Sequence, residues 1–200
     1  LPGKRCNDNL ETVGADRESR IWACCWSKGL GVFEKGAWRA VPFPSNYPIS
    51  LAETRTPSGE SILWVGTNDM GVVWREGNGP WRVLGPASGL PSVGVYALQA
   101  SGTRPDLWMG LREGGLVSLN LGGFTTFPRR EDLPNPATSA SLETRSSDGD
   151  AILWIATEGG LTAWKAGKKL PLPPILSGNP NLLVNTLIQT TAFGGSKVVA

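Results

Sequence analysis

The chain has 200 residues with 19 basic and 17 acidic side chains, so its formal net charge is only +2. Opposite charges are interspersed, and the tightest basic pair, Arg129-Arg130, is followed at once by Glu131-Asp132. Because no basic stripe is present, we expect neither nucleic acid nor an acidic membrane surface as a partner. We also expect no signal peptide and no membrane-spanning segment, since no apolar run is long enough.

A sequence repeat anchored on tryptophan runs through the chain. Each anchor follows an aliphatic residue and lies two positions before a small one, and the anchors are Trp22, Trp64, Trp108 and Trp154. They lie 42, 44 and 46 residues apart. Self-similarity at about 40–50 residues indicates stacked supersecondary units and fits a four-stranded propeller blade. We therefore expect one continuous array over residues 1–200 and no internal domain boundary.

Alternating apolar and polar residues between turn signals predict four strands in each repeat. The inner strand is expected around a triplet with a central acid or amide: Glu11, Glu53, Gln99, Glu143 and, in a truncated fifth repeat, Gln189. The second strand carries the tryptophan, the third begins with a pair such as Gly71-Val72, and the outer one carries Trp81 or Phe124. Helical periodicity is absent. The prediction is an all-β propeller of antiparallel four-stranded blades of about 42–46 residues.

Two positions of the repeat predict local geometry. The residue two after each tryptophan is small, which predicts a close approach of the neighbouring blade: Cys24, Gly66, Gly110 and Ala156. The glycine that precedes each following aliphatic residue predicts a positive φ: Gly29, Gly71, Gly115 and Gly160. We expect the anchor tryptophans to lie in the core, because aromatic side chains bury large apolar areas.

Both ends of the chain cut across repeats. The chain opens on Leu1-Pro2, which matches the loops before the triplets, and it stops two residues after Val198, the anchor position of the fifth repeat. We therefore expect a piece of a longer polypeptide and an incomplete propeller. Open blade faces would make the isolated piece prone to aggregate or dimerise.

The repeats of this chain resemble the two-component regulator propeller repeat family. The resemblance rests on the pattern Leu-Trp-Ile/Val-Gly-Thr-x-x-Gly-Leu followed by Gly-Leu-Pro, seen at 63–67 with 88–91 and nearly as well at 153–161. The third repeat has Leu111 where threonine is usual, and the first has Cys24-Cys25 in place of Gly-Thr. The resemblance implies a periplasmic or extracellular, ligand-binding sensor region of an inner-membrane receptor. A kinase, hybrid regulator or diguanylate cyclase output domain of the same chain would follow.

Catalytic chemistry is sparse in this sequence. It contains no histidine, which removes Ser-His-Asp and Cys-His arrangements, and it has neither a phosphate loop nor a dinucleotide fingerprint. We expect no enzyme activity, no metal and no cofactor. The alternative is a secreted or surface propeller that acts as an adhesion or scaffold module or as a glycan-active enzyme.

The three cysteines, Cys6, Cys24 and Cys25, leave one thiol over after any pairing. Cys24 and Cys25 are neighbours on a predicted strand, so their side chains point to opposite faces. A bridge from Cys6 to either is open in an oxidising compartment. Buried free thiols that behave as small hydrophobic residues are the favoured interpretation.

Two sets of polar residues are candidate sites. The recurring acid/amide positions could form a polar ring at a central channel, although hydrogen bonds between blades are favoured. The turns between second and third strands carry residues that differ from blade to blade: Trp26, Asn68, Arg112 and Glu158. We expect these turns to open on the same face as the loops between blades. They could bind a small polar ligand such as a glycan fragment or a peptide, or they could be ordinary solvated turns.

Overall fold

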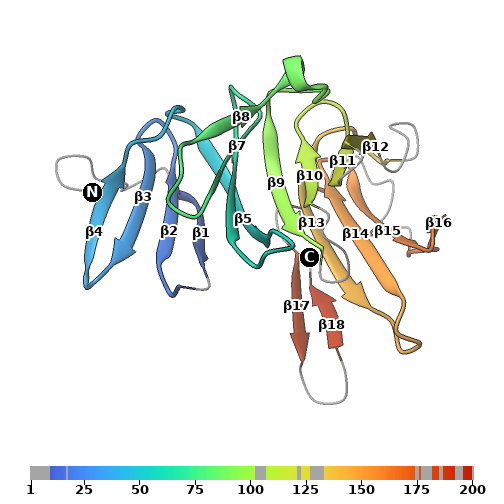
Figure 1. Cartoon of the computed structure of the whole chain (residues 1–200). Helices are drawn as coiled ribbons and strands as arrows, with labels where there is room; N and C mark the ends of the chain where they lie inside the picture. Colours follow the sequence, from blue (N-terminus) through green and yellow to red (C-terminus); the bar gives the residue numbers. More distant parts are fainter. Residues whose placement is uncertain are drawn as a thin grey trace. The chain divides into compact units, whose positions relative to one another are not determined.

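The structure, a computed structural model, describes residues 10–16, 18–101, 107–120, 123–126, 133–173, 176, 182–184, 187–191 and 196–199. In this part of the chain the regular elements are strands, apart from one 3-10 turn at Pro86–Ser88. They form four sheets of four strands each and one hairpin (Figure 1). The chain divides into two compact units, residues 1–100 and 101–200.

The first unit begins with two sheets whose strands follow chain order. Its strands are β1 (Leu10–Ala15), β2 (Ile21–Cys25), β3 (Gly29–Glu34), β4 (Ala37–Val41), β5 (Pro48–Arg55), β6 (Ser61–Thr67), β7 (Val72–Glu76), β8 (Arg82–Leu84) and β9 (Val95–Ala100). Neighbouring strands are antiparallel within each of these two sheets. The triplet strand β5 packs against β1 on one side and β9 on the other, as expected for inner strands.

The second unit repeats this architecture. Its strands are β10 (Leu107–Leu111), β11 (Leu116–Asn120), β12 (Gly123–Thr126), β13 (Thr138–Arg145), β14 (Ala151–Thr157), β15 (Gly160–Lys165), β16 (Lys168–Lys169), β17 (Ile188–Thr191) and β18 (Ser196–Val199). The fifth repeat supplies the antiparallel hairpin β17–β18. The sequence thus predicts the strand order correctly. One detail is wrong, because Trp81 lies one residue before β8 and not in it.

The glycines at the second turn of each repeat behave as predicted. Their φ values are all positive, and they are Gly29 (85°), Gly71 (90°), Gly115 (76°) and Gly160 (117°). At Gly71 a side chain is excluded twice over, since a Cβ would also lie 2.3 Å from the carbonyl oxygen of Leu84. These positions fix the hairpin between the second and third strands of each sheet.

The small residue after each tryptophan allows close approach of the neighbouring strand. A Cβ on Gly66 would lie 2.6 Å from the carbonyl oxygen of Val95 in β9 and 2.3 Å from Ser50 Oγ. At the equivalent position in the first sheet, Cys24 Sγ lies 4.0 Å from the carbonyl oxygen of Ser50. The expectation of a tight contact with the next repeat is therefore confirmed at Gly66, while Cys24 faces the next repeat at a longer distance.

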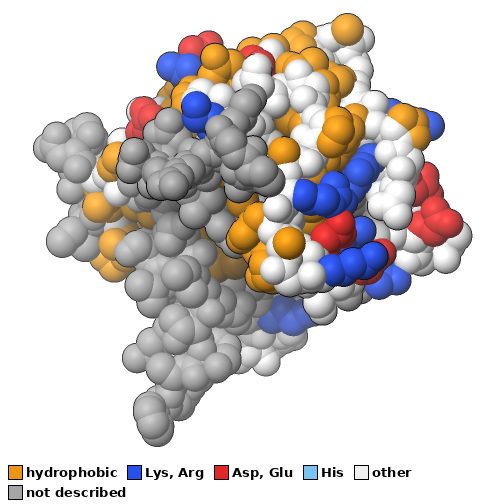
Figure 2. Space-filling view, turned by 90° about the vertical axis from the view of Figure 1, so that its left-hand side faces the viewer, with side chains coloured by type: hydrophobic (Ala, Val, Ile, Leu, Met, Phe, Trp, Pro, Cys, Tyr) orange, Lys and Arg blue, Asp and Glu red, His pale blue; other side chains and the backbone are white. Residues whose placement is uncertain are grey.

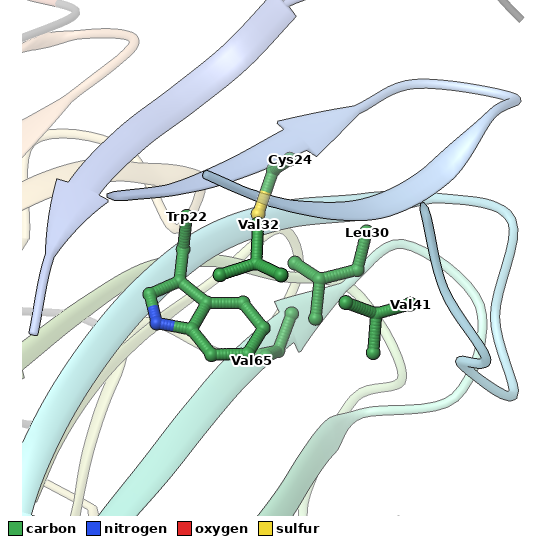
Figure 3. Packing of buried hydrophobic residues seen from close by; sticks show 6 residues of the cluster. All are labelled: Trp22, Cys24, Leu30, Val32, Val41 and Val65. Atoms are coloured by element: carbon green, nitrogen blue, oxygen red, sulfur yellow. The ribbon is translucent and has the colours of Figure 1, made fainter. Parts of the chain in front are cut away.

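The core of the first unit lies between its first two sheets. Trp22, Cys24, Leu30, Val32 and Val41 of the first sheet pack with Val65 of β6 (Figure 3). Trp22 is only 1% exposed, and Trp64 is also buried. The indole N–H of Trp64 donates to Thr54 Oγ1 at 2.7 Å. The anchors Trp22 and Trp64 are therefore core residues with a satisfied polar group, while Trp108 and Trp154 are half-buried and pack against the cores of the second unit.

The cysteines differ from the favoured interpretation. Cys25 is disulfide-bonded, whereas Cys24 is buried and is not part of a disulfide. Cys6 lies outside the described residues. The expectation that these cysteines form no disulfide is therefore wrong for Cys25 and correct for Cys24. Their opposite states follow from the strand geometry, which points adjacent side chains to opposite faces of the sheet.

Candidate functional site

The turns between second and third strands lie beside the loops that join consecutive sheets. In the first unit, the amide N–H of Asn68 donates to the carbonyl oxygen of Tyr47 at 3.0 Å. The amide of Gly71 donates in the same way to Val93 at 2.8 Å. Ser45 Oγ donates to Asp69 Oδ1 at 2.6 Å. Turns and linking loops of this unit therefore share one face, as the sequence predicts.

Two of the predicted ligand-binding residues form one cluster on that face. The rings of Trp26 and Tyr47 meet edge to face, with centroids 5.1 Å apart. Beyond them, the hydroxyl of Tyr96 donates to Asn68 Oδ1 at 3.1 Å. We call these four residues the aromatic turn cluster. Sequence reasoning missed Tyr47 and Tyr96. A signal was available, because they are the only two tyrosines of the chain and each lies at or beside the start of an inner strand.

The other two predicted residues lie in the second unit. The turn of Arg112 is joined to the loop 133–137 by the amide of Gly115, which donates to the carbonyl oxygen of Pro136 at 3.1 Å. The amide of Glu158 donates to Ala137 of the same loop, also at 3.1 Å. Both side chains are exposed. The structure therefore gives these two turns one shared loop, just as the loop at Tyr47 is shared by Trp26 and Asn68.

Among the acid/amide positions of the triplets, Glu53 and Gln99 make hydrogen bonds within their own repeat, whereas Glu143 bonds to the preceding repeat, as favoured from the sequence. Glu53 accepts a bond from Ser61 Oγ, and Glu143 accepts one from Ser101 Oγ at 2.9 Å. Gln99 Nε2 donates to the carbonyl oxygen of Ala100 at 2.9 Å. Glu11 and Gln189 lie on β1 and β17, but their side chains are outside the described part. Glu53 and Glu143 both line crevices between successive sheets, and a channel ring stays a prediction.

Beside Trp22, the crevice between the first two sheets is occupied by charged and aromatic side chains, and a cavity of about 460 Å³ lies at the strand ends of the same two sheets. The guanidinium of Arg75 lies 5.2 Å from the ring centroid of Trp22 and 4.5 Å from that of Trp81. A cavity of only about 60 Å³ remains beside Trp22. Burial lowers the pKa of Arg75, and the positive charges of Arg20 and Arg39 lower it further. The guanidinium therefore sits between two indole faces in a cation–π arrangement.

Asp16 closes the same crevice from the side of the first sheet. Its carboxylate accepts hydrogen bonds from Trp22 Nε1 at 2.6 Å and from Arg20 Nε at 2.7 Å. Burial alone would raise the pKa of Asp16, but these hydrogen bonds lower it below its ordinary value. The carboxylate is therefore held ionised.

The corresponding crevice in the second unit is open. A cavity of about 470 Å³ lies between β10–β12 and β13–β15. Its described lining includes Trp108, Trp164, Asn120, Glu143 and Asp150. A volume of this size is typical of small-molecule sites.

The charged side chains on the surface do not gather by sign. On the face shown in Figure 2, basic and acidic groups lie side by side.

Comparison with known proteins supports the fold. No protein-family model matches the chain, and no curated protein matches its sequence. The extracellular domain of the hybrid two-component system BT3049 from B. thetaiotaomicron is similar in structure, with a TM-score of 0.64 and 17% identity over 82% of this chain. The extracellular domain of the hybrid two-component system BT4673 from the same organism gives 0.63 and 23% over 90%.

A third similar structure is PorZ, a bacterial surface component of the type-IX secretion system of Porphyromonas gingivalis. It gives a TM-score of 0.55 with 15% identity over 92% of this chain. The chain covers only 22%, 24% and 30% of these three proteins, in the same order. At these identities the similarity shows the all-β fold of extracellular sensor and surface domains. Among the described residues, no helix is long and apolar enough to span a membrane.

Proposed function

We propose that this chain is a ligand-binding region of an extracytoplasmic sensor β-propeller in a signal-transduction receptor. It has no catalytic role and passes a binding signal to an output domain of the same receptor, a kinase or a diguanylate cyclase. The observation that carries the proposal is the shared architecture with extracellular domains of two hybrid two-component systems. The repeated Trp-x-Gly/Ala pattern is the second support.

The disulfide at Cys25 supports a location outside the cytoplasm. Disulfides persist in the periplasm and on the cell surface and are rare where thioredoxin and glutathione keep thiols reduced. Cys25 lies on a central strand of the first sheet and is buried, so its bond is part of the fold. We therefore assign the chain to the periplasm or the extracellular space.

We propose that the ligand binds on the face of the turns. The aromatic turn cluster offers an indole and two phenol rings beside an amide, and such a surface suits a small polar molecule, a glycan fragment or a peptide. Arg112 and Glu158 offer a guanidinium and a carboxylate on the equivalent turns of the second unit. The inter-sheet positions Glu53 and Glu143 have hydrogen-bonding roles in this proposal.

The experiment is a signalling assay in the complete receptor. Trp26→Ala, Asn68→Ala, Arg112→Ala and Glu158→Ala are each tested for output against inducer concentration. We expect at least one to shift the dose response by about tenfold, the effect of losing one charged or stacking contact. Trp38→Ala is the matched control, because Trp38 is an exposed tryptophan on the outer strand β4 (41% exposed). An unchanged dose response in all four folded variants would rule out the turn face.

A surface propeller without an output domain is the second candidate. It is favoured by the similarity to PorZ, which is a component of a secretion system at the cell surface. In that case the chain would act as an adhesion or scaffold module, or as a glycan-active enzyme. The complete reading frame distinguishes the two, since a transmembrane helix with a kinase or cyclase domain supports the sensor and its absence supports the surface module.

A further inference from the structure

The aromatic turn cluster presents hydrogen-bond donors that the fold does not use. The indole N–H of Trp26 and the hydroxyl of Tyr47 make no hydrogen bond with any residue that the structure describes. Asn68 accepts the Tyr96 hydroxyl through Oδ1, and its Nδ2 group has no partner in the described part of the chain. An indole N–H and an amide NH₂ can only donate, and a phenol hydroxyl can donate. The cluster therefore suits a ligand whose polar groups are acceptors.

The same residues offer apolar ring surface next to those donors. The ring planes of Trp26 and Tyr47 meet at 60°, so they present two differently oriented faces. Tyr47 is exposed, whereas Trp26 and Tyr96 are half-buried. Aromatic rings that are partly buried and partly exposed give a large contact area at a low cost in conformational entropy. The cluster thus combines apolar rings with donors at their edges.

The backbone around Tyr47 holds the cluster in place. The N–H of Tyr47 donates to Ser45 Oγ at 2.9 Å, and its carbonyl oxygen accepts the amide of Asn68 at 3.0 Å. Ser45 is buried, and its hydroxyl donates to Asp69 on the neighbouring turn. Pro48 follows Tyr47 and restricts the backbone before it to extended conformations. The binding surface is therefore formed before a ligand arrives, which lowers the cost of ordering it.

The charges around the cluster favour an uncharged ligand. The turns 26–28 and 68–70 carry one charged residue each, Lys28 and Asp69, of opposite sign. The linking loops 42–47 and 85–94 contain no charged residue. A neutral glycan and a neutral peptide both match this surface in charge, but they differ in hydrogen bonding. Each sugar hydroxyl donates as well as accepts, whereas a proline-rich peptide presents carbonyl acceptors without N–H groups.

We infer that the aromatic turn cluster binds a neutral, proline-rich peptide segment in the polyproline II conformation. The pyrrolidine rings of the ligand pack on the aromatic rings, and its carbonyl oxygens accept the N–H of Trp26, the hydroxyl of Tyr47 and the Nδ2 group of Asn68. A polyproline II helix makes no internal hydrogen bonds and is already extended, so its carbonyls are available and little order is lost on binding. The inference rests on the turn face proposed above and names the class of ligand that it binds.

The test is calorimetric titration of the full chain with hexaproline that is acetylated and amidated at its ends. The comparison ligands are the same peptide with alanine at every second position, and maltohexaose, a neutral sugar of similar size. We expect hexaproline to bind with a Kd of about 1 mM or below and the alanine-containing peptide to bind about tenfold more weakly, because it has fewer rings and a less ordered free state. We expect no saturable binding of maltohexaose. If hexaproline does not saturate the chain, or if maltohexaose binds more tightly than hexaproline, the inference is overturned.

Conservative variants locate the binding and test the donors. Trp26→Phe and Tyr47→Phe each keep a ring and remove a donor, so each should raise the Kd for hexaproline by about fivefold, the effect of one hydrogen bond. Trp26→Ala removes the ring as well and should raise it by about tenfold or more. Trp38→Ala, at an exposed tryptophan on β4, is the matched control and should leave the Kd unchanged. Melting temperatures confirm that each variant is folded. Normal binding in both Phe variants, or an equal loss in Trp38→Ala and Trp26→Ala, would contradict the inference.

The receptor assay separates a wrong ligand class from a wrong face. If Trp26→Ala shifts the response to inducer but the natural chain does not bind hexaproline, the turn face stands and the peptide ligand is ruled out. If hexaproline binds at Trp26 and Tyr47 but the response to inducer is unchanged in their variants, the peptide site stands and the turn face is not the sensor of that inducer.

Discussion

The two crevices between sheets show what a repeat specifies and what it leaves open. Both have a tryptophan from one sheet facing a leucine and a triplet glutamate from the next: Trp22 with Leu63 and Glu53, and Trp108 with Leu153 and Glu143. In the first unit Arg75 lies over the indole of Trp22 and about 60 Å³ remains beside that indole, while a second cavity of about 460 Å³ lies at the strand ends, lined by residues such as Glu18 and Glu76. In the second, Trp164 takes that position and about 470 Å³ remains. The anchors recur at each interface between sheets, while the variable position held by Arg75 or Trp164 changes what lies beside the anchor indole.

The largest effect should come from removing the anchor in the filled crevice. Trp22→Ala empties a site that is 1% exposed and should cost about 3–5 kcal/mol of the free energy of unfolding. Trp108→Ala should cost less, about 2–3 kcal/mol, because part of that indole already borders a cavity. Urea unfolding of both variants measures the difference. Equal losses would mean that the open crevice is packed as well as the filled one.

The disulfide should be the next largest contribution, and it belongs to the first unit. Cys25→Ser should lower the free energy of unfolding by about 2–4 kcal/mol, because it frees the unfolded chain. Cys24→Ala is the control and should cost about 1 kcal/mol, since it removes one sulfur from the core and no covalent bond. The melting temperatures of both variants, measured with and without a reducing agent, give the contribution of the disulfide. A reductant that shifts neither melt would show that the bond does not stabilise the sheet.

A smaller effect is expected at the residue that closes the first crevice. Arg75→Met keeps the aliphatic stem over Trp22 but removes the guanidinium, and should cost about 1 kcal/mol. The loss is limited because burial and the charges of Arg20 and Arg39 already disfavour the cation, as its lowered pKa shows. The measurement is the urea midpoint at low and high salt. A stabilised variant would indicate that the desolvation of Arg75 outweighs its contacts with the indoles.

The smallest effect is a pH dependence that separates the two units. The folded pKa of Asp16 is lowered, so its contribution is present above its unfolded pKa and is lost as the pH falls through the folded pKa. Asp16→Asn should therefore cost about 1 kcal/mol at pH 7 and progressively less below pH 4. In the second unit, hydrogen bonds from Lys165 lower the pKa of exposed Asp148 to about 2. Asp148→Asn should leave the unfolding midpoint nearly unchanged. A constant difference between Asp16→Asn and the natural chain from pH 7 to pH 3 would contradict this.

Much of the framework could be predicted because the residues that build it are repeated. The positive φ at Gly71 and the close approach of the neighbouring strand at Gly66 both require a residue without a side chain. Glycine at these two positions can be read directly from the sequence. The threonine of the triplet has a role that sequence reasoning missed. Thr54 and Thr144 accept the indole N–H of the anchor tryptophan in their own sheets. The signal was present, since threonine recurs at that position of the triplet.

The candidate sites could be predicted only in part, because side chains that meet across loops leave no periodic trace. The turns that carry Trp26 and Asn68 could be identified from topology. Their contacts with Tyr47 and Tyr96 depend on loop conformations that the sequence does not specify. The open crevice was missed for a different reason. Its lining includes Trp164 at the position that Arg75 holds in the first unit, and neither residue belongs to the repeated pattern.

The neighbouring cysteines of β2 have a consequence for how the first sheet is assembled. Cys24 faces the backbone of Ser50, and Cys25, pointing the other way, carries the disulfide. A slip of β2 by one residue would exchange the two sulfurs between the faces of the sheet. In that slipped register Cys24 would stand where Cys25 stands in the native sheet and could form the disulfide in its place. Oxidation would thus lock whichever register β2 holds when the bond closes, so the native bond at Cys25 requires that the strands align before the thiols are oxidised.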